Sequence, residues 1–252
     1  MNESQTLKNI AIFGASGAIG SAFTNQLANK KNKANVFAFS LSGKQFEYEN
    51  VHSHTFDITD EKSIETAITI ASAEAPLDLV LITTGLLHQN LSEKTTRESL
   101  GPEKALIDLS SDKFKHLFEV NTIGPALIAK HALPQMRKDK PSIFAALSAR
   151  VSSISDNHLG GWYAYRSSKA ALNMIIKTAS IEMKRRNKNL VVIGLHPGTV
   201  DSDLSKPFQK NTPKDKLFSA EHSVTKMLEV LEERKPDDTG KLFAWNGEEI
   251  QF

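Results

Sequence analysis

A tyrosine and a lysine lie four residues apart in the segment GGWYAYRSSKAALNMIIK, at positions 165 and 169. Residues with this spacing share one face of a helix, so the Tyr165 phenol and the Lys169 ammonium would be neighbours. A phenol has a pKa near about 10, and a nearby cation lowers that pKa because it stabilises the phenolate. The pair could therefore act as a tuned general acid and base, although the bare spacing also arises by chance. Tyr163 is a second phenol nearby, but its partner four residues on is Ser167, which carries no charge.

Three glycines follow the first apolar run of the chain, in the stretch AIFGASGAIGSAF. In a dinucleotide-binding turn, Gly14 would permit the sharp bend, Gly17 would let the backbone approach a pyrophosphate, and Gly20 would let the helix pack closely on the sheet. The phosphates would lie at the helix N-terminus, where unpaired N–H groups favour anions, and Ser16 could add a hydroxyl donor. A plain connecting turn is the alternative. The position between the first strand and the first helix favours the nucleotide site.

The second apolar run ends in FSLSGK, which contains no Asp or Glu. A site that prefers NAD carries a carboxylate here, about 20 residues after the glycines, to bind the ribose 2′-OH. Ser40 and Ser42 supply hydroxyls instead, and Lys44 supplies a cation that could meet a 2′-phosphate. An ordinary solvated turn lysine is the alternative for Lys44. The sequence therefore favours NADP(H) over NAD(H), and an NAD-linked alcohol oxidant stays as a further alternative.

These residues need a scaffold, and short apolar runs alternate with longer amphipathic segments along the chain. The runs expected to be strands are 9–14, 35–40, 51–57, 77–84, 142–148, 190–197 and 241–245. The segments expected to be helices are 18–30, 61–75, 112–133, 162–187 and 219–234. Apolar strands separated by helices are typical of a parallel sheet that is covered on both faces. The predicted fold is α/β, a single doubly wound Rossmann-type domain over residues 1–252 with a parallel sheet of about seven strands.

Two stretches lack this regularity. Residues 85–110 are polar and contain Gly101-Pro102, while residues 201–218 are rich in proline and lysine. Long loops in a compact domain are usually functional. We expect the parts 86–110 and 201–218, together with 149–160, to line the substrate site.

The composition excludes several classes of protein. The chain has 252 residues, 40% of them hydrophobic, and a net charge of only +2, so nothing favours a nucleic-acid or membrane partner. It has no cysteine, and of its eight histidines His52 and His54 share a strand face without a third ligand nearby, so no metal site is expected. The N-terminus has no secretory h-region, and no run of about 18 apolar residues occurs. A cytoplasmic protein is therefore expected.

Taken together, the motifs resemble those of the short-chain dehydrogenase/reductase family, in particular its carbonyl-reductase and C-factor-like branch. The resemblance covers nearly the whole chain, and several motifs in one order are far more specific than any single motif. The segments that carry it are FGASGAIG, DITDE at 57–61, FEVNTIGPALIAKHALPQM at 118–136, SIFAALSARVSSISDN at 142–157, GGWYAYRSSKAALN at 160–173, LHPGTVDSDLS at 195–205 and GKLFAWNGEEIQF at 240–252.

The resemblance implies a role for each matching residue. Tyr165 would protonate the carbonyl oxygen, Lys169 would hold the nicotinamide ribose hydroxyls and lower the Tyr165 pKa, and Asn121 would support a proton-relay water. Asp57 would contact the adenine ring, and residues 197–200 would lie against the nicotinamide carboxamide. The implied cofactor-binding set is Gly14, Ser16, Gly17, Ile19, Gly20, Ser40, Ser42, Asp57, Ile58, Gly85, Asn121, Tyr165, Lys169, Pro197, Gly198, Thr199 and Val200.

The chain departs from the family pattern at three places. The usual Gly-x-x-x-Gly-x-Gly is here Gly-x-x-Gly-x-x-Gly, and the usual Asn-Asn-Ala-Gly reads TTGL at 83–86, with only Gly85 in register. The position of the family's catalytic serine is also ambiguous. Counting back from Tyr165 reaches Ser152, the end of the strand is Ser148, and alignment on SARVSSI gives Ala149. We favour Ser148 as catalytic, with a turn or cap residue as the alternative.

The function that the resemblance implies is NADP(H)-dependent reduction of an aldehyde or ketone to an alcohol, with the proton supplied by Tyr165. A C-factor-like signalling protein that binds the cofactor but turns over little or nothing is the alternative. The expected partners are a small carbonyl or alcohol substrate and further copies of the chain. Segments 112–133 and 162–187 resemble the helices that form the dimer interface in the wider family, so a homodimer or homotetramer is expected.

Overall fold

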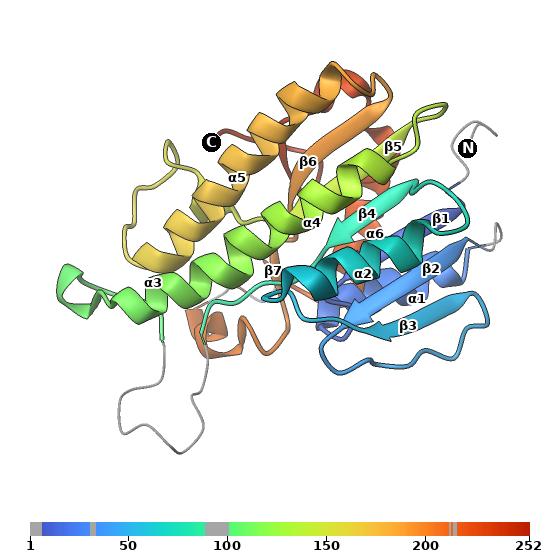
Figure 1. Cartoon of the computed structure of the whole chain (residues 1–252). Coiled ribbons are helices and arrows are strands. Elements are labelled where there is room, and N and C mark those ends of the chain that lie inside the picture. Colours follow the sequence, from blue (N-terminus) through green and yellow to red (C-terminus); the bar gives the residue numbers. More distant parts are fainter. Residues whose placement is uncertain (1–6, 31–33, 89–100, 212, 214–215) are drawn as a thin grey trace.

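The computed structural model describes residues 7–30, 34–88, 101–211, 213 and 216–252. Eight strands form one sheet in the order β10-β9-β6-β5-β4-β1-β2-β3 (Figure 1). Their bounds are β1 Asn9–Phe13, β2 Asn35–Ser40, β3 Val51–Thr55, β4 Leu79–Ile82, β5 Ser142–Leu147, β6 Leu190–His196, β9 Leu242–Ala244 and β10 Glu249–Ile250.

The predicted α/β class and the predominantly parallel sheet are confirmed. Every pair of neighbouring strands is parallel except β9 and β10, which are antiparallel. The sheet has eight strands rather than about seven because the chain turns back after β9 and adds Glu249–Ile250 at the edge. Two residues are too few for an apolar pattern to reveal a strand.

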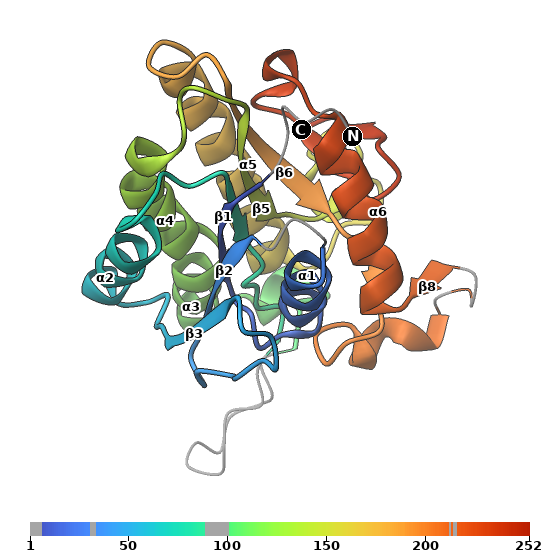
Figure 2. The ribbon, with the colours of Figure 1, turned by 90° about the vertical axis from the view of Figure 1, so that its right-hand side faces the viewer.

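Helices cover both faces of the sheet, as Figures 1 and 2 show from two sides. The helices are α1 Ala18–Ala28, α2 Glu61–Ser72, α3 Ser111–Phe118, α4 Gly124–Ala132, α5 Tyr163–Lys184 and α6 Ala220–Glu233. Successive residues of β1 point to opposite faces, so Ile12 packs with residues of α1 and α6, whereas Phe13 packs with residues of α2, α4 and α5. Both faces are buried, which explains why the strands are continuously apolar.

The segment 112–133, predicted as one helix, is interrupted. A π-helical turn, Glu119–Ile123, separates α3 from α4. This turn contains Asn121, whose side chain is fully buried. Single π-helical turns inside helices often occur at functional sites.

The two irregular stretches contain only short elements where the structure describes them. They include η2 Leu106–Asp108, η6 Lys206–Asn211 and the strand β8 Leu217–Phe218, which pairs in parallel with β7 Thr199–Val200. Residues 89–100, 212 and 214–215 of these stretches lie outside the described residues. The remaining short helices are η4 Leu133–Gln135, η5 Arg150–Ser152 and η8 Pro236–Asp238. Within the described ranges, none of the helices is long and apolar enough to cross a membrane, and no group of side chains could hold a metal ion.

The sheet order places the site. From β1 the chain moves outward to β2 and β3, and then returns to β4 on the other side of β1. The connections after β1 and β4 therefore diverge, which opens a crevice at the carboxyl ends of these strands. The glycine turn follows β1, and TTGL follows β4.

Candidate active site

The glycine turn is held between β1 and β2 in a conformation that only glycine fits. Gly14 has a φ of +94°, and the N–H groups of Gly14 and Ala15 both donate to the Phe39 carbonyl, at 2.8 and 3.0 Å. A Cβ atom on Gly14 would lie 2.8 Å from Thr83 Oγ1. A Cβ atom on Gly20 would lie 2.2 Å from the Gly14 carbonyl oxygen. The bend and the close approach of α1, both predicted from the sequence, are therefore present.

The N-terminus of α1 is open. Its N-cap is Gly17, which has no side chain to accept from the first N–H groups, and the first turn carries no acidic residue. Free N–H groups at a helix N-terminus together with the helix dipole suit an anion, so this turn fits the pyrophosphate of a dinucleotide. A polar cavity of about 390 Å³ lies at the same place. Its lining residues are Ser16, Ala18, Ser21, Ala22, Asn25, Lys44, Asp201, Ser219, Ala220 and Glu221.

The residues predicted to select NADP(H) gather beside α1. Lys44 Nζ donates to Ser21 Oγ at 2.8 Å and lies 5.4 Å from the ring centre of Phe46. Ser42 is exposed, whereas Ser40 is buried and its hydroxyl accepts from the Lys44 backbone N–H at 3.1 Å. Ser40 thus braces the turn, while Ser42 and Lys44 face the solvent.

Asp57 and Ile58 follow β3, and their side chains make different kinds of contact. Asp57 Oδ1 accepts from both the N–H and the hydroxyl of Thr59, at 2.9 and 2.7 Å, and so closes a tight turn. Ile58 packs against α4, where a Cβ atom on Gly124 would lie 2.3 Å from Ile58 Cγ1. Ile19 packs against the core on the α1 side of the sheet. Among these three predicted cofactor contacts, the side chains of Ile58 and Ile19 therefore serve packing.

The segment TTGL rebuilds the sheet edge without asparagine. Thr83 Oγ1 donates to the Phe13 carbonyl at 2.9 Å and ties β4 to β1. Thr84 Oγ1 is buried and has no hydrogen-bond partner among the described residues. Because buried hydroxyls are normally satisfied, this atom fits a polar group of a bound cofactor. A Cβ atom on Gly85 would lie 3.6 Å from Lys169 Nζ and 3.9 Å from Asn121 Oδ1.

Two of the predicted catalytic residues, Lys169 and Asn121, meet at Gly85 from separate elements, and Tyr165 lies one turn before Lys169 on α5. Tyr165 and Lys169 lie on the buried face of α5, with 8% and 2% of their surface exposed. Lys169 Nζ donates to the Leu147 carbonyl at the end of β5, at 2.9 Å. Asn121, from the π-helical turn, accepts from the N–H of Leu86 and donates to its carbonyl, both at 2.8 Å. The Asn121 amide also donates to Ser168 Oγ on α5 at 3.1 Å.

Burial dominates the electrostatics of this group. Burial raises the pKa of Tyr165 to about 12, because a phenolate would lose its hydration. Burial lowers the pKa of Lys169 to about 8 for the corresponding reason. The expected lowering of the Tyr165 pKa by Lys169 is not seen in this structure, where burial is the cause of the shift and its direction is upward. The phenol is protonated at neutral pH and available as an acid.

Ser148 and Ser152 form a buried network with Asn173. Ser148 Oγ donates to Asn173 Oδ1, and Asn173 Nδ2 donates to Ser152 Oγ, both at 2.7 Å. Ala149 instead belongs to the apolar cluster that contains Tyr165. The structure thus brings the two serines together at Asn173, and the catalytic role of Ser148 stays a prediction.

The segment 197–200 rests on a layer of aromatic side chains. Gly198 has a φ of +76°, and a Cβ atom there would lie 2.9 Å from Phe218 and 3.0 Å from Trp245. The Pro197 carbonyl accepts from Ser223 Oγ at 2.6 Å. Thr199 is exposed and Val200 is buried, where it pairs with Phe218. The aromatic side chains of Phe218 and Trp245 therefore support this loop.

The sequence did not reveal the aromatic side chains that join the two irregular stretches over Tyr165. The ring of Trp162 lies 6.2 Å from that of Tyr165 and 5.0 Å from that of Phe208. His88, which follows β4, lies 5.7 Å from Phe208 and contacts the carbonyls of residues 203 and 204 through Nε2. Phe208 is one of two aromatic residues, with Phe218, in the proline- and lysine-rich stretch 201–218, and this was the signal available from the sequence. The described parts of both loops therefore meet next to the phenol.

A doubly wound sheet with a bare glycine turn and a buried Tyr–Lys–Asn group at its carboxyl edge defines a class of nucleotide-dependent oxidoreductases. The sequence model of the short chain dehydrogenase family matches residues 8–213. The chain belongs to this family.

Comparisons with individual proteins agree with this assignment. The protein named C-signal from Myxococcus xanthus is 34% identical over 148 residues, which cover 59% of this chain and 84% of that protein. An uncharacterized oxidoreductase of Schizosaccharomyces pombe is 26% identical over 266 residues, covering 98% of this chain and 99% of its own.

Solved structures share the fold along nearly the whole chain. The NADPH-bound carbonyl reductase from chicken fatty liver has a TM-score of 0.81 at 22% identity, covering 98% of this chain and 99% of its own. A short-chain dehydrogenase/reductase from Burkholderia multivorans with bound NADP has a TM-score of 0.78 at 20% identity, covering 98% of this chain and all of its own.

Proposed function

We propose that the protein is an NADP(H)-dependent reductase that converts an aldehyde or ketone to an alcohol. The observation that carries the proposal is the meeting of Lys169 and Asn121 at Gly85, with Tyr165 one turn before Lys169 on the buried face of α5. The segment that contains Gly85 also contacts Gly14, next to the open N-terminus of α1. A hydride donor bound along the glycine turn would end next to an acid that is protonated at neutral pH. This is the arrangement that carbonyl reduction requires.

Each residue has a task in the proposed reaction. The dinucleotide, when bound, supplies the hydride. The Tyr165 phenol donates its proton to the carbonyl oxygen, and its high pKa keeps that proton in place until negative charge develops on the oxygen. Lys169 binds the ribose hydroxyls and stabilises the phenolate that remains. Asn121 holds the π-helical turn against α5 through Ser168.

The preference for NADP(H) is part of the proposal. Ser42 and Lys44 present a hydroxyl and a cation beside α1, and residues 41–44, directly after β2, include no carboxylate that would repel a phosphate. Leu41 lies between the two serines with 76% of its surface exposed, so we add it as an apolar contact for the adenine ring. The NADPH in the chicken enzyme and the NADP in the Burkholderia enzyme support the same choice.

The test of the function replaces each phenol in turn. Tyr165→Phe should lower kcat/KM for NADPH-dependent reduction roughly 10²- to 10⁴-fold, because the proton donor is lost, while the Kd of NADPH changes by no more than about threefold. Tyr163→Phe is the matched control and should retain activity. A panel of aldehydes, ketones and quinones measured with NADPH and NADH in parallel supplies the substrates. Unchanged activity in Tyr165→Phe would refute the assignment.

A signalling role without turnover is the second candidate, and the 34% identity to C-signal is the observation that favours it. In that case the chain would bind NADPH through the glycine turn, yet no carbonyl compound in the panel would oxidise it. A binding titration together with the activity screen distinguishes the two functions.

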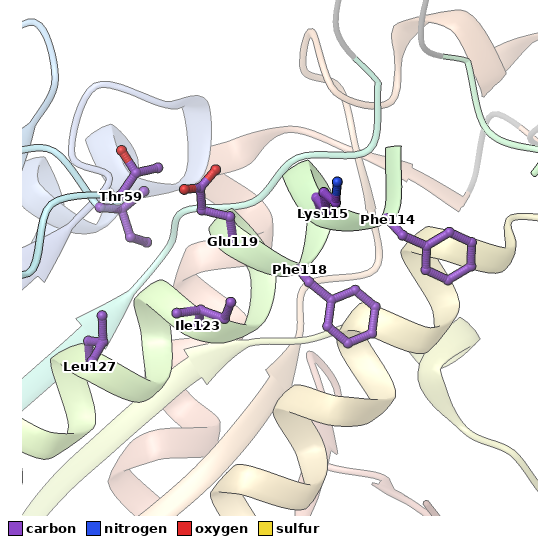
Figure 3. A pocket seen from close by; sticks show the side chains of 8 residues that line it. Thr59, Phe114, Lys115, Phe118, Glu119, Ile123 and Leu127 are labelled. Atoms are coloured by element: carbon purple, nitrogen blue, oxygen red, sulfur yellow. The ribbon is translucent and has the colours of Figure 1, made fainter. Parts of the chain in front are cut away.

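We also propose that the chain forms a homodimer, or a homotetramer built from that dimer, through α3, α4 and α5. An apolar groove of about 740 Å³ runs along α3 and α4, lined by Ile58, Thr59, Phe114, Lys115, Phe118, Glu119, Ile123 and Leu127 (Figure 3). Ile123, one of the lining residues, is half exposed, and Met174 and Ile181 are exposed on α5. Exposed apolar surface of this kind marks an interface. Light scattering of the wild type and of Ile123→Asp, which should dissociate, tests the proposal.

A further inference from the structure

The helix that carries Tyr165 and Lys169 begins in an unusual way. Three consecutive residues, Gly160, Gly161 and Trp162, have φ values of +63°, +67° and +54°. Trp162 is the one non-glycine residue with positive φ in the part of the chain that the structure describes. Bulky residues rarely adopt this conformation, which persists only when surrounding contacts enforce it. Trp162 is also the N-cap of α5, and its side chain accepts no hydrogen bond from the helix.

Two of the contacts that hold this start come from a residue far away in the sequence. Glu103 precedes α3, and its backbone carbonyl accepts from the Trp162 N–H at 2.6 Å. Its carboxylate Oε2 accepts from the Ala164 N–H at 3.3 Å. The side chain of Glu103 therefore serves as the cap that Trp162 does not provide. A carboxylate is suited to this place because the helix dipole favours negative charge at the N-terminus.

Glu103 is buried, with 3% of its surface exposed, so its contacts are not those of a surface carboxylate. Burying a carboxylate is costly unless hydrogen bonds compensate for the lost hydration. Arg166 holds the same turn from the other side, since its Nε donates to the Gly161 carbonyl and its Nη1 donates to the Val151 carbonyl, both at 3.0 Å. Arg166 supplies donors only. Glu103 is therefore the side chain that accepts from the Ala164 N–H at this end of α5.

The capped amide lies next to the phenol. Ala164 directly precedes Tyr165, which is the third residue of α5. If the first turn of α5 frays, the phenol loses its fixed place relative to Lys169, which is anchored one turn later to Leu147. A displacement of about 1 Å at a reacting group can lower a rate roughly 10²-fold. The cap and the acid are thus mechanically linked.

We propose that Glu103 is the positioning residue of the active site: it caps the N-terminus of α5 from outside the helix and thereby fixes the Tyr165 phenol. This proposal rests on the proposed reductase function, because its effect on rate acts through Tyr165. Glu103 touches neither substrate nor cofactor in this account. Its role is the hydrogen bond to Ala164 and the left-handed start of the helix that this bond secures.

Three variants test the proposal. Glu103→Ala should lower kcat about 10- to 100-fold, while the Kd of NADPH stays within about twofold, because the glycine turn is untouched. Glu103→Gln keeps an oxygen that can accept from Ala164, so it should restore kcat to within about threefold of the wild type. Asp238→Ala is the matched control. Its carboxylate accepts from the Lys235 N–H at the start of η8, at 2.9 Å. Because η8 precedes β9, it lies at the amino ends of the parallel strands, opposite to the carboxyl ends where the candidate site lies. Loss of this carboxylate should lower Tm but leave kcat within about twofold of the wild type.

Hydrogen exchange gives a readout that does not depend on turnover. Amides 162–166 should exchange faster in Glu103→Ala than in the wild type, and Glu103→Gln should restore their protection. Wild-type kcat in Glu103→Ala, or a Gln variant as slow as the Ala variant, would overturn the proposal. If the wild type reduces no carbonyl compound, the proposed function is refuted. Unchanged exchange of amides 162–166 in Glu103→Ala would refute the capping role of Glu103, whether or not the protein is a reductase.

Discussion

Two helix N-termini meet the proposed active site, and they are built in opposite ways. The N-terminus of α1 is bordered by glycines. Gly17 has no side chain that could cap the helix, and a Cβ atom at Gly14 or Gly20 would collide with neighbouring atoms. At α5, a buried carboxylate from a distant loop occupies the place that a ligand could take. The first N-terminus can receive an anion, whereas at the second the Ala164 N–H is already bonded to Glu103, which holds the start of the helix in place. The difference shows that one feature of helix geometry serves binding when it is left open and positioning when it is closed.

Among the predicted changes, a substitution of Gly20 should have the largest effect on the open N-terminus of α1. Gly20→Ala would place a methyl group 2.2 Å from the Gly14 carbonyl, so we expect a loss of stability of about 1–3 kcal/mol together with a loss of NADPH affinity of roughly 100-fold or more. Thermal unfolding and a fluorescence titration measure the two effects.

Gly17→Ala separates binding from folding at the same turn. Its Cβ atom would meet only the Gly14 carbonyl oxygen, at 3.5 Å, which is ordinary contact. The variant should keep its Tm and still lose NADPH affinity, because the methyl group would stand where the pyrophosphate approaches. Wild-type affinity in Gly17→Ala would place the phosphates elsewhere.

A substitution of Ser42 tests whether the site beside α1 selects NADPH over NADH. Ser42→Asp introduces a carboxylate beside Lys44, which should repel a 2′-phosphate and accept from a free 2′-OH. We expect the ratio of NADPH to NADH affinity to fall roughly 10- to 100-fold, mostly through NADPH. Side-by-side titrations measure the ratio, and Ser111→Asp, at an exposed serine in the first position of α3, serves as the control. An unchanged ratio would contradict the 2′-phosphate site.

The closed region holds a buried ammonium, and its burial makes the stability of the fold depend on pH. The pKa of Lys169 is about 8 in the folded chain, below the ordinary value of 10.5. The unfolded chain thus binds more protons between these values, so the free energy of unfolding rises with pH there, by at most about 1.4 kcal/mol per pH unit. Below pH 8 the full penalty is present. Lys169→Met removes this dependence, and urea unfolding from pH 7 to 10 measures the difference. Parallel pH profiles for the two proteins would show that Lys169 does not titrate in this window.

The sequence predicted what local patterns encode. Apolar runs separated by amphipathic segments were enough for the doubly wound sheet, and the glycine spacing and the pair Tyr165 and Lys169 fall where the pattern places them. The strand β10 and the π-helical turn were missed because two residues or one extra residue leave no periodic signal.

Contacts between distant segments were beyond such reasoning. Glu103 reaches α5 across 61 residues of chain, and Ser148 finds Asn173 across 25. The direction of the Tyr165 pKa was also predicted wrongly, because it depends on how deeply the phenol is buried rather than on which residue is four positions away.

The π-helical turn between α3 and α4 changes the direction in which the side chains of α4 point relative to those of α3. Each residue of an α-helix rotates the face it presents by about 100°, so one additional residue offsets everything that follows it. With the offset, Leu117 on α3 packs in the cluster around Tyr165 while Ile128 on α4 packs against the sheet. Asn121 stands at the junction, where it bonds to both the β4 edge and α5. Deleting one residue of this turn would rotate α3 and α4 relative to each other. Either Leu117 or Ile128 would then no longer face its own cluster, even with both helices intact.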